Sequence, residues 1–266
     1  MKKIKVGDIE IAYNIVGSGE PLILIGGFTM VKESWDLQVA GLKDHFRVIT
    51  FDNRGVGQTT VPTRPFTIAD MAADTDGLMN VLGIDAAYIF GVSMGGLIGQ
   101  TLALDYPTRI KKAALGCTSH GGKHAVQPEK EVMEALAKTA DPSISPDESV
   151  RMKVSITFTK QFIRDEPEKV EEYIRSCLEH YPSADGASGQ MKALSFFNVK
   201  KRLDEITCPV LVITGSEDKM MPPDNSRLLA EGIPHARLSV IKGAGHNFFY
   251  EKPVETNTLL KSFFTS

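Results

Sequence analysis

The residue best suited to do chemistry is a serine set between glycines. Residues 91–95 read Gly-Val-Ser-Met-Gly, a G-x-S-x-G pattern that puts Ser93 between a short apolar stretch at 87–90 and an apolar helical stretch. A serine hydroxyl is a poor nucleophile unless a base removes its proton, and a sharp strand-to-helix turn exposes the hydroxyl for attack. The simpler alternative is a glycine-rich structural turn. A Walker phosphate loop is excluded, because no Gly-Lys-Ser/Thr follows.

Two further residues follow predicted strands and could activate this serine. Asp218 comes after the buried apolar stretch 209–214, and His246 lies in a glycine-flanked loop after the predicted strand 236–241. Side chains at the carboxyl ends of parallel strands share one crevice, where an acid can orient an imidazole that takes the serine proton. Alone the acid is a weak signal, because a loop acid is usually solvated and Glu217 competes with it.

No metal or organic cofactor is expected. His120 and His124 have the i,i+4 spacing of paired ligands, but the two glycines between them disfavour the helix that this spacing needs. The three cysteines contain no C-x-x-C pair and match no zinc framework, which favours reduced thiols and a cytoplasmic location. They are Cys117, Cys177 and Cys208.

The elements around these loops alternate between strand-like and helical stretches. This alternation predicts a mostly parallel sheet with helices on both faces, preceded by an N-terminal hairpin. The expected strands are 3–6, 9–15, 21–25, 47–51, 87–90, 111–115, 209–214 and 236–241, and the expected helices are 68–82, 97–104, 224–231 and 253–264.

Between the two halves the pattern changes, and no buried-strand stretch occurs from Thr118 to about Lys200. We interpret residues 119–200 as a helical cap inserted into an α/β core made of residues 1–118 and 201–266. Helices are expected at 129–138, 148–163 and 167–180, with a polar linker at 182–189.

The chain order Ser93, Asp218, His246 is typical of one family of triad enzymes. Nearly the whole chain resembles the α/β-hydrolase family, whose D-x-R-G-x-G segment matches residues 52–57, and the elbow at 91–96 is similar to that of 3-oxoadipate enol-lactonases and small carboxylesterases. The resemblance implies an eight-stranded sheet and the roles of nucleophile, acid and base for these three residues. Serine at the elbow, where haloalkane dehalogenases and most epoxide hydrolases have aspartate, favours acyl chemistry.

The same resemblance implies an oxyanion hole made by the backbone N–H groups of Met94 and Phe28. Family members usually read His-Gly-X before the second donor, whereas this chain reads Gly26-Gly27-Phe28. The donor is a backbone N–H and needs no particular side chain. The replacement of the histidine by Gly26 therefore bears only on how rigidly the loop is held.

We predict a hydrolase of carboxylic esters with small to medium acyl groups, acting through an acyl-enzyme. Alternatives with the same triad are lactone or C–C bond hydrolysis and cofactor-free perhydrolysis; a non-catalytic binding protein of this fold is less favoured. An apolar pocket suits a neutral ester or lactone better than a charged acid, with Arg54 and Lys160 as candidate exceptions. The expected pocket residues are Trp35, Phe158, Phe162, Phe197 and Phe248.

Composition excludes other classes of protein. A formal charge of −3 and a pI near 6.1 give no basic surface for nucleic acid. No apolar stretch approaches the length of a membrane span. The expected partner is a small-molecule ester or lactone, and a homodimer stays open.

Overall fold

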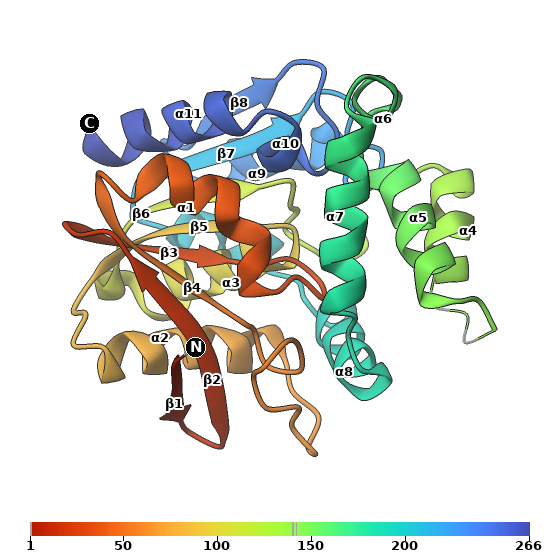
Figure 1. Ribbon diagram of the computed structural model, residues 1–266. Helices are drawn as coiled ribbons and strands as arrows, with labels where there is room; N and C mark the ends of the chain where they lie inside the picture. The colour runs from red at the N-terminus through yellow and green to blue at the C-terminus, as the bar shows by residue number, and fades with distance from the viewer. Residues whose placement is uncertain (1, 140, 142) are drawn as a thin grey trace.

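The computed structural model describes residues 2–139, 141 and 143–266, and one eight-stranded sheet forms its centre (Figure 1). The strands are β1 (Lys2–Val6), β2 (Ile9–Val16), β3 (Glu20–Ile25), β4 (Phe46–Phe51), β5 (Ala87–Val92), β6 (Ile110–Gly116), β7 (Val210–Gly215) and β8 (Arg237–Ile241). Their order is β1-β2-β4-β3-β5-β6-β7-β8. The β1–β2 and β2–β4 pairs are antiparallel and the other pairs are parallel, which confirms the predicted N-terminal hairpin and mostly parallel sheet.

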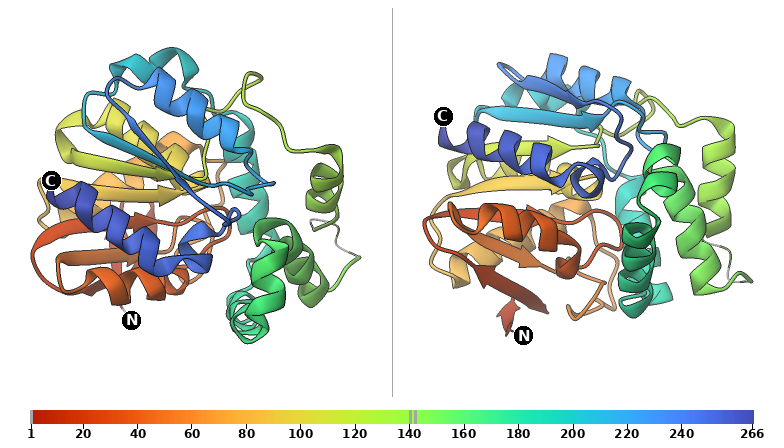
Figure 2. Two further views of the ribbon diagram at one scale, coloured as in Figure 1. Left: turned by 90° about the horizontal axis from the view of Figure 1, so that it is seen from above. Right: turned by 45° about the horizontal axis from the view of Figure 1, so that its top comes forward.

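Helices cover both faces of the sheet, as predicted (Figure 2). Along β3, Ile23 and Ile25 pack into one hydrophobic cluster, while Leu22 and Leu24 pack into the other. Successive side chains of a strand point to opposite faces, so a continuous apolar stretch marks a strand that is buried on both sides. The first face carries α2 (Ile68–Val81), α3 (Met94–Asp105) and α9 (Pro223–Gly232), and the second carries α1 (Asp36–Leu42), α10 (Phe248–Glu251) and α11 (Pro253–Thr265).

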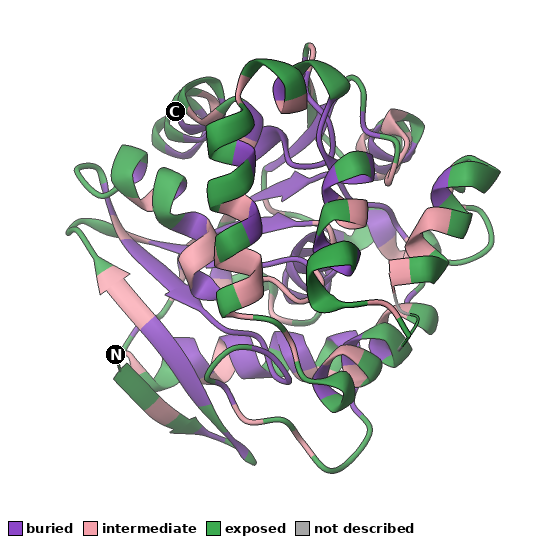
Figure 3. Cartoon of the chain, turned by 45° about the vertical axis from the view of Figure 1, so that its right-hand side comes forward, coloured by how far each residue is buried: buried purple, intermediate pink, exposed green. Residues whose placement is uncertain are grey.

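Among the described residues, five α-helices lie between β6 and β7 in the chain and form a group beside the sheet (Figures 1 and 2). They are α4 (Lys130–Thr139), α5 (Pro146–Thr157), α6 (Lys160–Asp165), α7 (Pro167–Glu179) and α8 (Ala184–Ser195). Some of them share a hydrophobic cluster that includes Val154, Phe158 and Ile174. Their outer faces are exposed, whereas the central strands of the sheet are mostly buried (Figure 3). They fall within the predicted cap, whose boundaries stay a prediction and whose residues 140 and 142 lie outside the described part.

Two predictions about the cap were wrong. The single helix expected over 148–163 is two helices, because Phe158 is extended and the Thr159 side chain caps α6 by accepting a hydrogen bond from the Phe162 N–H. The linker expected at 182–189 is mostly helix α8, which the Ser183 hydroxyl caps in the same way. Helices α1 and α10 were not predicted.

Candidate active site

The turn that carries Ser93 joins β5 to α3 and requires its two glycines. Ser93 has φ 53° and ψ −118°, a conformation that is strained for a residue with a side chain. A Cβ atom at Gly91 would overlap the carbonyl oxygen of Gly95, and one at Gly95 would overlap that of Ile25. The Ser93 N–H donates to the Gly116 carbonyl at 2.8 Å, so the turn is also fastened to β6. The predicted strand-turn-helix context is therefore present.

His246 and Asp218 meet in the loops after β8 and β7. The distance from His246 Nδ1 to Asp218 Oδ2 is 2.9 Å, and both side chains are buried. The other carboxylate oxygen of Asp218 accepts the Met221 N–H at 2.8 Å. The two loops pack backbone against backbone, because a Cβ at Gly215 would overlap the carbonyl oxygens of the histidine loop. Glu217, the competing acid, is exposed.

The carboxylate changes the proton affinity of the ring. Burial opposes the charged imidazolium, but the adjacent Asp218, together with Cys117, outweighs it and raises the pKa of His246 well above its ordinary value of 6.5. The bond at Nδ1 leaves the other ring nitrogen, Nε2, to exchange a proton with a hydroxyl. Among the hydrogen bonds of the described residues none joins Ser93 to His246; catalytic hydrogen bonds are often loose without substrate.

Cys117 is a neighbour of this pair that the sequence reasoning missed. It directly follows β6, is fully buried and has φ 39°. Its sulfur, a carboxylate oxygen of Asp218 and a ring nitrogen of His246 all lie within 4.8 Å of one another. These are atoms of kinds that bind metals, but the carboxylate and the ring are already hydrogen-bonded to each other. Its place at a strand end, between those of Ser93 and Asp218, was the available signal.

The loop after β3 lies against Ser93. A Cβ at Gly27 would lie 3.2 Å from the Cβ of Ser93. The loop and turn hydrogen bonds of the described residues include none donated by the N–H of Phe28 or Met94. Neither N–H group is therefore engaged in these bonds, and their role as oxyanion donors stays a prediction.

Three side chains hold this loop in the absence of the family histidine. Asn53 Nδ2 donates to the Gly26 carbonyl at 3.0 Å, and the Gly27 N–H donates to the sulfur of Met30 at 3.1 Å. The Thr29 N–H donates at 2.9 Å to Oε1 of Gln190, a fully buried residue of α8.

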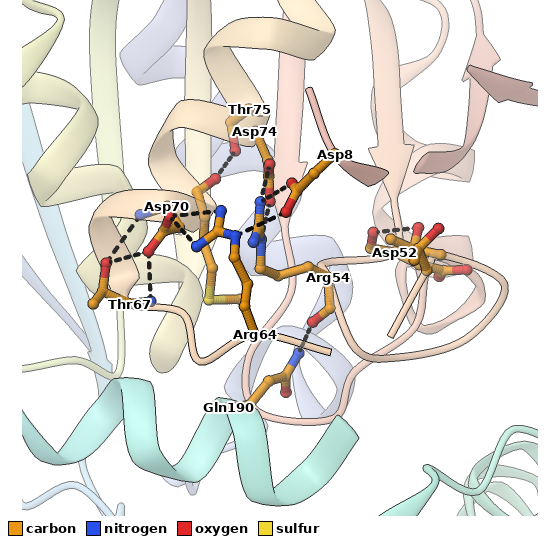
Figure 4. A network of polar contacts seen from close by, with 12 residues as sticks. Asp8, Asp52, Arg54, Arg64, Thr67, Asp70, Asp74, Thr75 and Gln190 are labelled. Atoms are coloured by element: carbon orange, nitrogen blue, oxygen red, sulfur yellow. Dashed lines mark hydrogen bonds and ion pairs between the residues drawn. The ribbon is translucent and has the colours of Figure 1, made fainter. Parts of the chain in front are cut away.

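The D-x-R-G-x-G segment, residues 52–57, also supports the loop after β3. Arg54 is buried and donates to both oxygens of Asp74 at 2.5 and 2.6 Å, with a further contact to Asp8 at 3.4 Å (Figure 4). Its carbonyl accepts from Gln190 Nε2 at 3.1 Å. The Arg54 side chain is thus engaged by aspartates. Lys160, the other suggested exception, is exposed.

The predicted pocket residues are buried in three separate clusters. Trp35 and Phe248 lie on the α11 face of the sheet, Phe197 on the opposite face, and Phe158 stacks on Phe162 in the cap. Whether any of them contacts substrate stays a prediction. Two open surface hollows, of about 450 and 600 Å³, include no triad residue. The first is lined by Lys123, His124, Asn198, Lys200 and Lys201, and the second by Pro167, Glu168, Glu171 and Arg175.

Comparison with known proteins gives one consistent family. The α/β-hydrolase fold family matches residues 20–253. The chain is 27% identical over 97% of its length to RutD of Azorhizobium caulinodans, provisionally named a carbamate hydrolase, and covers 96% of that protein. It is 31% identical over 97% of its length to BpoC of Mycobacterium tuberculosis, provisionally named a non-heme bromoperoxidase, and covers 98% of it.

A solved structure agrees with these relatives. The enol-lactonase from Burkholderia xenovorans LB400 superposes with a TM-score of 0.88 at 28% identity, over 100% of both chains. Among the described residues, no helix is long and apolar enough to cross a membrane. On its fold, its strand-end loops and these matches, the chain belongs to the α/β-hydrolase fold family.

Proposed function

We propose that the protein is a serine hydrolase that cleaves carboxylic esters, with Ser93 as nucleophile, His246 as general base and Asp218 as the acid that orients the ring. The observation that carries the proposal is the buried His246–Asp218 hydrogen bond beside the strained turn of Ser93. A strained backbone persists only where surrounding structure fixes it, and such positions cluster at active sites.

Each step uses a group of this chain. Nε2 of His246 takes the proton of Ser93 Oγ as Oγ attacks the carbonyl carbon, and the N–H groups of Met94 and Phe28 stabilise the negative oxygen. The ring returns the proton to the leaving alcohol as the C–O bond breaks. Water, deprotonated by His246, then attacks the acyl-enzyme, and the carboxylic acid and free serine are released.

The names of the relatives point to other reactions that the same triad could catalyse. In a lactone the leaving alcohol remains part of the acyl group, so an enol-lactone would pass through the same steps. Peroxide in place of water would give a peracid, the reaction expected behind a bromoperoxidase activity, and monochlorodimedone bromination tests for it. A panel of esters, lactones and diketones separates these substrates, because the triad is common to all of them.

The first test replaces the nucleophile. Ser93→Ala should lower kcat on p-nitrophenyl butyrate by about 10,000-fold or more, since no hydroxyl remains to form the acyl-enzyme. A fluorophosphonate probe should add to Ser93 in the wild type and not in the variant. Ser155→Ala, at an exposed serine of α5, is the control and should keep full activity. Unchanged turnover by Ser93→Ala at an unchanged melting temperature would refute the proposal.

A further inference from the structure

One cation of the cap, Lys153, stands on a turn of α5 that is linked to both the oxyanion loop and the histidine loop. It stands in the last turns of α5, and its carbonyl accepts a hydrogen bond from the Thr157 hydroxyl one turn later. The Thr157 carbonyl accepts the N–H of Asn247, the residue after His246, at 3.0 Å. In the other direction, Lys153 Nζ lies 6.0 Å from the centroid of the Phe28 ring. This turn of α5 therefore contacts both the histidine loop and the oxyanion loop.

In the described part of the chain, Lys153 lacks the acidic partner that the buried cations Lys32 and Arg54 have. Lys32 is paired with Asp52 at 3.1 Å and with Glu33, and Arg54 is paired with Asp74. Among the ion pairs of the described residues, none involves Lys153. Burial lowers the pKa of Lys153, and only Cys177 on α7 acts in the opposite direction. Contact with an aromatic face compensates an ammonium only in part, so this group lacks the counter-charge that the others have.

The side chain is nevertheless accessible. Lys153, Phe28 and Ser93 are each partly exposed, whereas their neighbours Met94 and His246 are buried. Phe28 belongs to the loop that lies against Ser93, and Lys153 Nζ is 6.0 Å from its ring, so the ammonium and Ser93 belong to one partly exposed region.

We propose that Lys153 binds a carboxylate carried by the acyl part of the substrate, so that the preferred substrates are monoesters or lactones of dicarboxylic acids. The proposal rests on the hydrolase function above and names its substrate class. A carboxylate would supply the missing counter-charge and would be held more strongly than at an exposed lysine, because the site is partly desolvated. A lysine is a single point charge, which suits one carboxylate better than a phosphate that calls for several donors. The expectation of a neutral substrate came from the aromatic residues alone.

The test compares esters that differ in charge and little else. Monomethyl succinate, glutarate and adipate are paired with methyl butanoate, pentanoate and hexanoate, and hydrolysis is followed by proton release at pH 7.5 for the wild type, Lys153→Met, Lys153→Gln and Lys138→Met. In the wild type, kcat/KM should favour the charged ester at one chain length, set by the distance from Lys153 to the reacting carbonyl. Both Lys153 variants should lower this charged-to-neutral ratio by about 10-fold or more. Lys138→Met, which removes an exposed lysine of α4, should leave it unchanged.

The outcomes separate this inference from the proposed function. If the wild type hydrolyses neutral esters and takes the fluorophosphonate label but shows no charge preference at any length, the Lys153 assignment is wrong and the hydrolase survives. If both Lys153 variants lower the two kcat/KM values equally, Lys153 supports the oxyanion loop and does not bind substrate. If no ester is hydrolysed and no label is taken, the hydrolase proposal itself fails.

Discussion

The sheet core holds the catalytic groups mainly through its main chain, whereas the cap reaches them through a few polar side chains and one main-chain hydrogen bond, from the Asn247 N–H to the Thr157 carbonyl. In the core, Ser93, Asp218 and His246 stand on short loops after strands, and close backbone approaches at Gly95 and Gly215 leave those loops little freedom. Apart from that bond, the cap contacts the same region through single side chains, which include Gln190 at the oxyanion loop, Thr159 at Glu251 and Lys153 at Phe28.

This difference separates two kinds of control over the reaction. A core substitution removes a group that every substrate needs, so it should lower kcat for all esters alike. A cap substitution leaves the reacting atoms in place and should either relax a loop or change the ratio between substrates. Comparing the sizes of these effects tests whether the core sets kcat for all esters while the cap sets loop order and the ratio between substrates.

The largest effect is expected in the core, at Asp218. Asp218→Asn keeps the side-chain size but removes the charge that fixes the ring and stabilises its protonated form, so kcat should fall by about 10,000-fold. The pH profile gives a second readout. His246 must be deprotonated to act, and its raised pKa places the acid limb of kcat/KM above 6.5 in the wild type. Without the carboxylate this limb should move to lower pH.

The neighbouring acid is the matched control for that experiment. Glu217 is exposed and lies one residue away, so Glu217→Gln should change neither kcat nor the acid limb. A loss at Glu217 with none at Asp218 would reverse the assignment.

A smaller and uniform effect is expected where the cap meets the oxyanion loop. Gln190→Ala leaves the Thr29 N–H and the Arg54 carbonyl without their partner, and a looser loop should lower kcat by about 10-fold, less than removal of an oxyanion donor itself. Gln190→Glu keeps the acceptor for Thr29 and should recover part of the rate. For neutral and charged methyl esters measured side by side, kcat should fall by the same factor. Gln161→Ala, at an exposed glutamine of α6, is the control, and a changed charged-to-neutral ratio would count against a positioning role.

The difference between the sheet core and the cap also explains which features could be predicted from the sequence. Strand β3 was found because Leu22 to Ile25 are all buried, which leaves a continuous apolar stretch. Ser93 and Asp218 were predicted at strand ends because each closely follows such a stretch, and His246 because it follows the predicted strand 236–241, which is mostly exposed. These signals are local in the chain and therefore visible without coordinates.

The cap contacts depend on residues far apart in the chain. The first turns of helix α8 were predicted as part of a polar linker over 182–189, yet Gly186 is required there by close approach, since a Cβ would overlap the Gly55 carbonyl. Gln190 meets Thr29 across 161 positions, and Glu251 meets Thr159 across 92. An isolated glutamine or glutamate in a helix has no local pattern that distinguishes it from a surface residue.

The smallest effect is expected at Glu251, the cap contact on the histidine side. Its buried carboxylate accepts the Gly245 N–H at 2.8 Å with one oxygen and the Thr159 hydroxyl at 2.6 Å with the other. Glu251→Gln keeps the shape but replaces one acceptor by a donor, so the histidine loop should loosen and kcat should fall by about 3-fold, a loss of under 1 kcal/mol. Glu255→Gln, at an exposed glutamate of α11, is the control.

The pKa shift of Glu251 determines how the stability difference between the wild type and this variant changes with pH. Burial raises the pKa of Glu251 above 4.5, despite the hydrogen bonds from Thr159 and Gly245 that favour the charged form. A carboxyl group with a raised folded pKa contributes stability that is complete below 4.5 and is lost as pH rises through the folded pKa. The glutamine variant lacks this titration, so the wild type's free energy of unfolding, taken relative to the variant's, should fall between pH 4.5 and neutrality. Urea unfolding of both proteins at several pH values measures it, and a relative stability that rises over this window would show that the hydrogen bonds to the carboxylate outweigh its burial.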